Sequence, residues 1–227
     1  SFGVDHWEYT HHDTKRCAAL VKHFDAVSVR EASGVDLCKR YLGVKAQHVL
    51  DPTLLLDRAD YERLVANEQE PPRDGSLFCY ILDKTANKQQ VIESAARDTA
   101  LQPFYTMPEL EPTIANVTRD IEACVFPAVT AWLRSFMDAK MVVTDSFHGC
   151  VFSIIFNKPF WVIGNAERGM ARFKSLLSQF GLEERMISVQ DIATTIWQKP
   201  IDWQRVNARR DALRVEALQF LQNSLTL

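Results

Sequence analysis

Residues 142–149 read Val-Val-Thr-Asp-Ser-Phe-His-Gly and hold the side chains best suited to chemistry in this chain. A buried strand is expected to end in the polar pair Asp145 and Ser146, with a helix beginning at once. In open α/β sheets, ligands bind outside the carboxyl ends of strands, and helix N-termini favour anions such as phosphate or carboxylate. His148, in the first helical turn, could donate a proton or bind an anion. The alternative is that Asp145 or Ser146 only caps the helix and His148 packs in the core.

Arginines occur at two similar junctions. Arg30 lies where the strand-like run Val27–Val29 gives way to a helix, and its planar guanidinium suits carboxylate or phosphate. A surface pair with the neighbouring glutamate is the simpler interpretation. Arg168 and Arg172 follow another buried strand, share one helix face and could meet a phosphate. Such a pair is more often a solvated helix start. Asp51, before a proline, is interpreted as a turn or capping residue.

Composition limits the class of protein. The chain has 227 residues, 47% hydrophobic and 24% charged, which indicates a folded protein of one large domain or two small lobes. Its net charge of −3 gives no support for nucleic-acid binding. The sequence holds no apolar run of about 18 residues, as a membrane-spanning helix would need.

Cysteines and motifs narrow the chemistry further. The five cysteines are odd in number and widely spaced, without a CxxC pair, so we expect no metal site and a reducing, cytoplasmic compartment. The spacings GxGxxG, GxxxxGK[ST], GxSxG and HExxH do not occur. A Rossmann dehydrogenase, a P-loop kinase and a serine hydrolase therefore lack their usual support.

Short β-branched runs alternate with helical stretches, which predicts a Rossmann-like α/β fold with a mostly parallel, layered sheet. Strands are expected at 26–29, 48–50, 77–82, near 104, at 141–144 and at 159–163. Helices are expected at about 13–23, 32–42, 59–66, 87–99, 126–138, 170–180 and 206–221. We expect Leu20, Val21 and Phe24 to face inward and 109–118 to be an irregular loop. The polar stretch 68–75, which contains Pro and Gly, is the best linker.

Three segments match a known pattern in order: FDAVSVREASG (Phe24–Gly34), LDPTLLLD (Leu50–Asp57) and VVTDSFHGCVFSIIFNKPF (Val142–Phe160). On these residues the chain resembles the polysaccharide pyruvyl transferase family. RFKSLLSQFGL (Arg172–Leu182) is similar to the family's C-terminal segment. Because the chain begins without Met, the resemblance implies the C-terminal portion of a longer enzyme.

The resemblance implies a fold similar to a GT-B glycosyltransferase, with two Rossmann-like lobes and the site between them. Residues 1–67 would be the tail of an incomplete first lobe, and 68–227 the second lobe. The implied reaction moves the pyruvyl group of phosphoenolpyruvate onto a sugar of a cell-surface polysaccharide (exopolysaccharide) precursor as a ketal, releasing phosphate. The acceptor would be a sugar or a lipid-linked saccharide. Phosphoenolpyruvate is the donor substrate, and no cofactor or metal is implied.

The resemblance also implies roles for single residues. Arg30 would bind the anionic donor and face His148 across the cleft. His148 would act as the general acid that protonates the methylene carbon of the donor, and nearby donor anions would raise its pKa. Asp145 would belong to the same binding motif. Ser146 stands where better-characterised members have the arginine of Arg-x-His, so one neutral hydrogen bond replaces a charged clamp. Arg168, Arg172 or a residue outside this chain would then supply the charge.

Two rival functions remain at the level of sequence. A GT-B glycosyltransferase that uses a nucleotide sugar would need the same fold and a basic pocket. A non-catalytic or degenerate binding lobe would explain Ser146. The closing helix carries Arg205, Arg209, Arg210 and Arg214, which could touch the inner face of an anionic membrane, although a solvated helix face is simpler. Neither the acceptor sugar nor the oligomeric state follows from the sequence.

Overall fold

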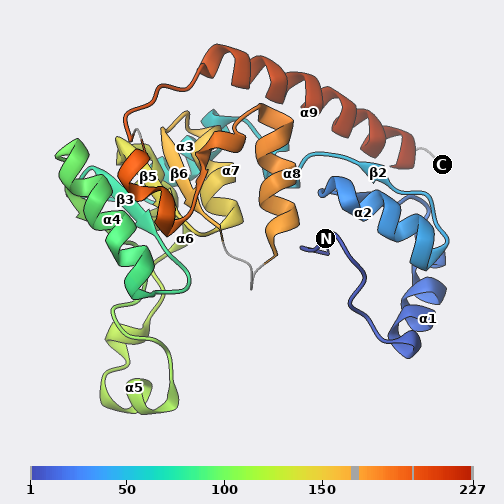
Figure 1. The fold of residues 1–227 in the computed structure, drawn as a ribbon, viewed down its shortest axis with the longest axis horizontal. Helices are drawn as coiled ribbons and strands as arrows, with labels where there is room; N and C mark the ends of the chain where they lie inside the picture. Colours follow the sequence, from blue (N-terminus) through green and yellow to red (C-terminus); the bar gives the residue numbers. More distant parts are fainter. Residues whose placement is uncertain (1, 165–168, 196, 226–227) are drawn as a thin grey trace. The chain divides into compact units, whose positions relative to one another are not determined.

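The computed structural model describes residues 2–164, 169–195 and 197–225, which form two compact units (Figure 1). The first unit comprises Ser1–Leu56, Gly164–Arg185 and Asp202–Leu227. The second comprises Asp57–Ile163 and Met186–Ile201. Strands pair in parallel in both units, so the predicted α/β class with a parallel, layered sheet is confirmed. The predicted lobes, 1–67 and 68–227, stay a prediction.

A five-stranded parallel sheet forms the centre of the second unit. Its spatial order is β4-β3-β5-β6-β7. The strands are β3 (Leu77–Tyr80), β4 (Pro103–Phe104), β5 (Met141–Thr144), β6 (Phe160–Ile163) and β7 (Met186–Ile187). The chain runs outward from β3 to β4 and then returns past β3 to β5. The order therefore reverses between β3 and β5, and ligands of doubly wound sheets bind at the carboxyl side of such a switch point.

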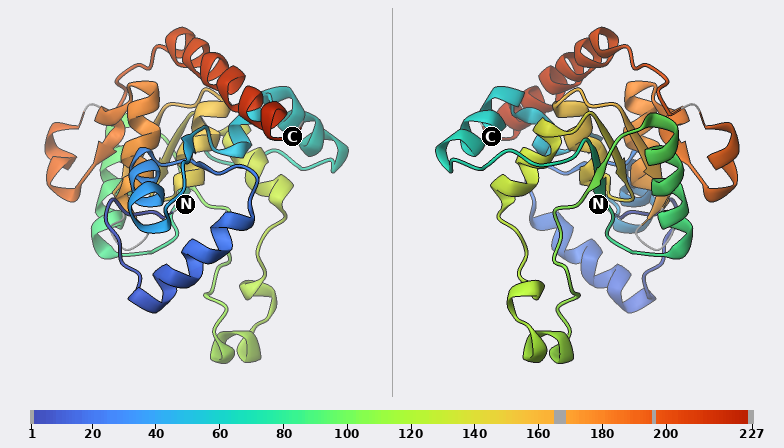
Figure 2. Two further views of the ribbon diagram at one scale, coloured as in Figure 1. Left: turned by 90° about the vertical axis from the view of Figure 1, so that its right-hand side faces the viewer. Right: turned by 90° about the vertical axis from the view of Figure 1, so that its left-hand side faces the viewer.

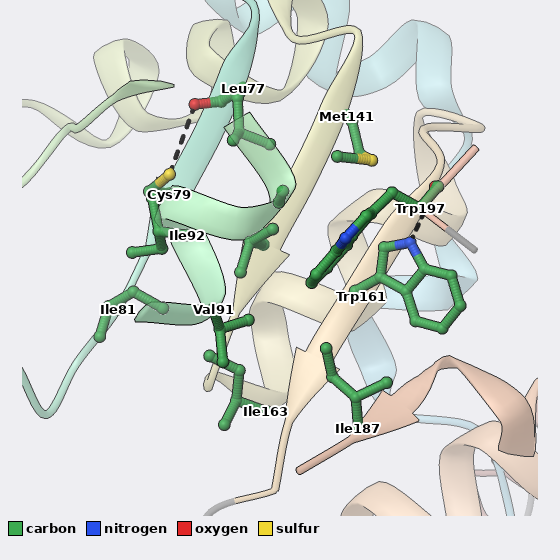
Figure 3. Close-up of a cluster of buried hydrophobic side chains, with 12 residues drawn as sticks. Leu77, Cys79, Ile81, Val91, Ile92, Met141, Trp161, Ile163, Ile187 and Trp197 are labelled. Carbon is green, nitrogen blue, oxygen red and sulfur yellow. Dashed lines mark hydrogen bonds between the residues drawn. The ribbon is translucent and has the colours of Figure 1, made fainter. Parts of the chain in front are cut away.

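One face of this sheet is covered by α4 (Ala86–Thr99) and by the 3-10 segment η6 (Val189–Thr194). Alternate residues of each strand point to it, because successive side chains of a strand face opposite sides. Figure 3 shows this buried cluster, in which Trp161 donates from Nε1 to the carbonyl oxygen of Trp197 at 3.0 Å. Its buried members are Leu77, Cys79, Ile81, Val91, Ile92, Ala95, Met141, Val143, Trp161, Ile163, Ile187 and Trp197.

The opposite face is covered by α3 (Arg58–Asn67), α6 (Val129–Asp138) and α7 (Phe147–Ile155). Aromatic rings dominate this layer. Phe78 of β3 meets Phe136 of α6 edge to face at 4.9 Å between ring centroids. Tyr61 of α3 likewise meets Phe152 of α7 at 5.0 Å. The first pair packs α6 against the sheet, and the second packs α3 against α7.

Between β4 and α6 the chain makes a long excursion that extends away from the sheet (Figures 1 and 2). It carries the short helix α5 (Ile114–Arg119) and the 3-10 turn η4 (Glu122–Cys124). The prediction of an irregular loop over 109–118 is therefore partly wrong. The hydroxyl of Thr113 caps α5 by accepting from the amide of Asn116, while α5 itself buries no side chain.

The first unit holds the two-stranded parallel sheet of β1 (Ser28–Val29) and β2 (Gln47–His48). Its helical elements are α1 (His11–Leu20), η1 (Val21–His23), α2 (Ala32–Leu37), the π-helical turn η2 (Cys38–Leu42), η3 (Pro52–Leu55), α8 (Met170–Phe180), η5 (Glu183–Arg185) and α9 (Trp203–Leu225). A small core gathers around four buried residues, Val29, Cys38, Leu42 and Ala46. Helix α8 joins this unit because the amide of Ala32 donates to Ser175 Oγ at 3.0 Å.

The prediction that Leu20 and Phe24 face inward is wrong, since these residues are 54% and 67% exposed. Helix α1 turns a different stripe toward the core: Cys17, Ala18 and Val21 pack there. Val21 follows Ala18 by three positions and Cys17 by four, so these side chains can share one helix face. Within the described part of the chain, no helix is both long and apolar enough to span a membrane.

Candidate functional site

The carboxyl ends of β3 and β5 are tied together by Asp145. Its carboxylate is fully buried: Oδ1 accepts from the amide of Leu82 at 2.7 Å and Oδ2 from the amide of Asp83 at 3.1 Å. Lys88, in the first turns of α4, places Nζ 2.6 Å from Oδ2. The charge of Asp145 thus joins three elements at the switch point of the sheet, and its predicted contact with substrate stays a prediction.

A close approach between β5 and α7 shapes the turn that follows. The buried Thr144 hydroxyl donates to the carbonyl oxygen of Tyr80 at 2.7 Å and accepts from the amide of Ser146 at 3.0 Å. A Cβ atom on Gly149 would lie only 2.2 Å from Thr144 Oγ1. Only glycine fits at position 149. The absence of a side chain there lets the first turn of α7 pack directly against Thr144 at the end of β5.

Ser146 caps α7, as one of the two sequence interpretations holds. Its Oγ accepts from the amide of Gly149 at 3.4 Å, and its side chain is 5% exposed. A hydroxyl that accepts in this way still has its own proton to donate. The residue can therefore both cap the start of the helix and offer one neutral hydrogen bond to a ligand.

His148 lies two residues further, in the first turn of α7, and is exposed. The interpretation of His148 as a packed core residue is therefore wrong. Its imidazole meets the ring of Phe147 edge on, at 5.4 Å and 84°. Phe147 is buried, so this contact places the exposed imidazole against the folded core. A positioned, accessible imidazole is what general acid–base chemistry requires.

His148 and Ser146 border a pocket of about 520 Å³ that we call the aromatic pocket. It lies beside the switch point, because Tyr80 and Leu82 at the end of β3 also line it. Most of its wall is apolar, with His148, Ser146 and Thr106 as polar neighbours. The full lining is Tyr80, Leu82, Thr106, Met107, Phe126, Pro127, Val129, Trp132, Ser146, His148 and Phe152. A largely apolar cavity with a few convergent polar groups is typical of a ligand site.

Arg30, in the first unit, is held by two buried carboxylates. Its Nη1 donates to Asp51 Oδ2 at 2.6 Å, and its Nε lies 3.5 Å from Glu31 Oε1. The arginine side chain is 21% exposed, whereas Glu31 is fully buried. The interpretation as an ordinary surface pair is therefore wrong. Burial opposes the charge of Asp51, but hydrogen bonds from Thr53 and Arg30 outweigh it, so the pKa of Asp51 is lowered.

Arg172 and Arg168 are the other two arginines that the sequence predicts for the site. Arg172, in α8 of the first unit, places its guanidinium carbon 5.6 Å from the ring centroid of Phe173. Arg168 lies outside the described residues. The structure thus brings Asp145, Ser146 and His148 together in the second unit. That Arg30 faces His148 across a cleft stays a prediction.

The sequence did not identify Lys88, and it predicted only a turn or capping role for Asp51. Asp51 does cap η3, accepting from the amide of Thr53 at 3.1 Å, but it also pairs with Arg30. Its place in the matched segment Leu50–Asp57 was a usable signal. Lys88 and Asp145 are far apart in the chain, and no spacing rule connects them. Across the described ranges, no group of three or more His, Cys, Asp or Glu side chains could hold a metal ion.

Comparisons with known proteins add a family match. The family model for polysaccharide pyruvyl transferases matches residues 1–167. No curated protein matches the chain. Among solved structures, the chain is similar to one described as the glycotransferase of kitacinnamycin, with 12% identity and a TM-score of 0.48. That alignment covers 94% of this chain and 62% of the other, so the chain spans less than two thirds of that protein's length.

Proposed function

The chain belongs to the polysaccharide pyruvyl transferase family, and on that premise we propose that it transfers the pyruvyl group of phosphoenolpyruvate to a sugar. The acceptor would be a saccharide, free or lipid-linked, of a cell-surface polysaccharide precursor, and the product a cyclic ketal. The observation that carries this proposal is the exposed imidazole of His148, which stands in the first turn of α7 on the wall of the aromatic pocket.

The proposed chemistry begins with a proton from His148. Transfer of this proton to the methylene carbon of the donor creates an oxocarbenium-like centre at the neighbouring carbon. One sugar hydroxyl adds to that centre, and its proton restores the imidazolium. A second hydroxyl then displaces phosphate by breaking the carbon–oxygen bond, and its proton leaves with the phosphate. A histidine suits the first step because its pKa lies near neutral pH.

Helix α7 and Ser146 support binding of the anionic donor at this place. The N-terminus of a helix carries a positive partial charge and favours anions nearby. The Ser146 hydroxyl adds one neutral donor at the position where the resemblance implies an arginine in other members of the family. The resemblance implies that other arginines supply the missing positive charge. Arg172 and Arg168 are candidates, and Arg30 is the strongest.

The environment of Arg30 favours a binding role over a purely structural one. A guanidinium has five N–H donors in a rigid fork. Asp51 and Glu31 fix its orientation, while a fifth of the side chain stays exposed. An oriented and partly exposed guanidinium is suited to a phosphate or carboxylate.

The compartment and the membrane contact belong to the proposal as well. All five cysteines carry free thiols, which suits the reducing cytoplasm. A precursor built on a lipid carrier would bring the protein to the inner face of the membrane. The arginines of α9 would be the contact to test there.

A thermal-shift titration tests the donor. We expect phosphoenolpyruvate to stabilise the protein by about 2.7 kcal/mol at one hundred times its dissociation constant. The shift should disappear in Arg30→Ala and weaken in Arg30→Lys, which keeps the charge but loses the fork. Arg40→Ala is the matched control, because Arg40 is 70% exposed and pairs with Asp36, which is also exposed.

Each other result of the titration points to a rival function. A shift with nucleoside diphosphates and none with phosphoenolpyruvate would indicate a glycosyltransferase. Binding of phosphoenolpyruvate without phosphate release, in the presence of acceptor, would indicate a non-catalytic lobe. An equal loss of binding in Arg30→Ala and Arg40→Ala would remove Arg30 from the site.

A further inference from the structure

Trp132 lines the aromatic pocket and is packed among three other aromatic rings. Three rings meet it nearly at right angles: Tyr80 at 5.4 Å and 62°, Phe136 at 4.9 Å and 84°, and Phe152 at 4.8 Å and 74°. The indole is half-buried, so part of it borders the pocket. A large aromatic surface fixed in this way loses little conformational entropy when a ligand packs on it.

The indole nitrogen of Trp132 is in an unfavourable environment, which packing of the ring does not explain. Its Nε1 is shielded from solvent and has no hydrogen-bond partner among the described residues. A buried donor without a partner destabilises the folded state. Phenylalanine would fill much of the same space without that cost. The tryptophan is therefore better explained by the ring surface that it presents to the pocket.

The two ends of the aromatic pocket differ in polarity. His148 and Ser146 stand at the end formed by the first turn of α7. Phe126 and Val129, which are 60% and 67% exposed, form an apolar rim at the start of α6. A ligand that fits must therefore offer an apolar surface to Trp132 and polar groups toward His148.

We propose that the aromatic pocket binds the pyranose ring of the acceptor saccharide, with one C–H face of the sugar packed on Trp132. A pyranose has the required two-sided character, because its axial C–H bonds form an apolar face and its hydroxyls lie around the edge. The electron-rich face of an indole attracts such C–H groups. This places a pair of hydroxyls at the polar end, beside His148. The inference rests on the proposed function, since it takes the sugar beside His148 to be the acceptor.

Binding of simple sugars tests the pocket without any need for turnover. The probes are the methyl glycosides of glucose, galactose, mannose and N-acetylglucosamine, followed by saturation-transfer NMR and tryptophan fluorescence. We expect at least one glycoside to bind wild type. Its affinity should fall about 10-fold in Trp132→Leu, which removes the ring, and about 3-fold in Trp132→Phe, which shortens it.

Trp197→Phe is the matched control. The indole nitrogen of Trp197 also lacks a hydrogen-bond partner among the described residues, but Trp197 is buried in the cluster on the other face of the sheet. Sugar binding should be unchanged in this variant. Trp132→Phe should unfold at the same temperature as wild type or higher, because it removes an unpaired donor, so weaker sugar binding could not be blamed on lost stability.

Three results would overturn the inference. One is that no glycoside binds wild type, and another is that Trp132→Leu and Trp197→Phe bind equally well. The third is that octyl glucoside binds far more tightly than methyl glucoside through Trp132, which would make the pocket a site for an alkyl chain. The proposed function fails separately: glycosides bind through Trp132, but phosphoenolpyruvate neither binds nor releases phosphate.

Discussion

The turn after β5 and the junction after β1 start from the same local plan, a parallel strand that leads into a helix through polar residues. They use their charges differently. At the β1 junction, Asp51 and Glu31 pair with the partly exposed guanidinium of Arg30 and fix its orientation. At the β5 turn, the carboxylate of Asp145 accepts from the amides of Leu82 and Asp83 and pairs with Lys88.

The difference shows what each region can contribute to a reaction. The β1 junction can supply a positioned cation for an anionic ligand. The β5 turn presents an imidazole and a hydroxyl at the border of the aromatic pocket. A charged residue inside a matched motif can thus be a scaffold, while Ser146 and His148 beside it line the pocket.

The largest stability effect should come from removing the charge of the β5 turn. We expect Asp145→Asn to lower the free energy of unfolding by about 3 kcal/mol, because it leaves Lys88 and one backbone amide without their anion. Urea denaturation measures this. The control is Asp98→Asn, whose carboxylate is 44% exposed and pairs with exposed Arg97, so the loss should stay within about 0.5 kcal/mol. Similar losses in the two variants would contradict the scaffold role of Asp145.

A smaller loss is expected where β5 and α7 touch. Gly149→Ala places a methyl group within 2.2 Å of Thr144 Oγ1, and we expect a cost of about 2–3 kcal/mol from the displaced helix. Gly43→Ala is the comparison, because Gly43 has open space around it and a φ of 68°. That variant should lose only about 1 kcal/mol through backbone strain. The reverse order would show that α7 does not rest on the strand as described.

The smallest effect concerns the pH dependence of the β1 junction. The pKa of Asp51 is lowered in the folded protein, since hydrogen bonds from Thr53 and Arg30 outweigh the effect of burial. A lowered pKa stabilises the fold above the unfolded pKa, and the stabilisation is lost as the pH falls through the folded pKa. The stability difference between wild type and Asp51→Asn should therefore be full at neutral pH and shrink below about pH 4.

Denaturation curves across this range measure the difference. Asp36→Asn, at a position 69% exposed, should differ from wild type by little at any pH. A gap between wild type and Asp51→Asn that is independent of pH would mean that the charge of Asp51 does not stabilise the junction.

Much of the fold could be predicted where the apolar pattern and the capping residues indicated the same element bounds. Strand 141–144 and helix 170–180 have the predicted bounds, and Gly181 ends the helix with a φ of 64°. Helix α5 could not be found in this way, because it buries no side chain and so leaves no apolar period. Its one signal was the capping residue Thr113.

The site was only partly within reach of sequence. The motif from Thr144 to Gly149 fixed its own local geometry, so Asp145, Ser146 and His148 were found together. The partners of Asp145 and the wall of the aromatic pocket come from distant parts of the chain, and only the order of the strands brings them to one edge. The sequence alone therefore does not single out Trp132.

The most direct test of the central claim is transfer of a solvent proton to the donor by His148. Turnover of phosphoenolpyruvate with acceptor in deuterated water should place one deuteron in the methyl group of the product, as seen by NMR. His148→Gln should slow phosphate release by about 10²–10⁴-fold while it leaves donor binding and unfolding intact, because the side chain is exposed. His12→Gln, at an exposed position of α1, should match wild type. Unchanged phosphate release in His148→Gln would contradict the account.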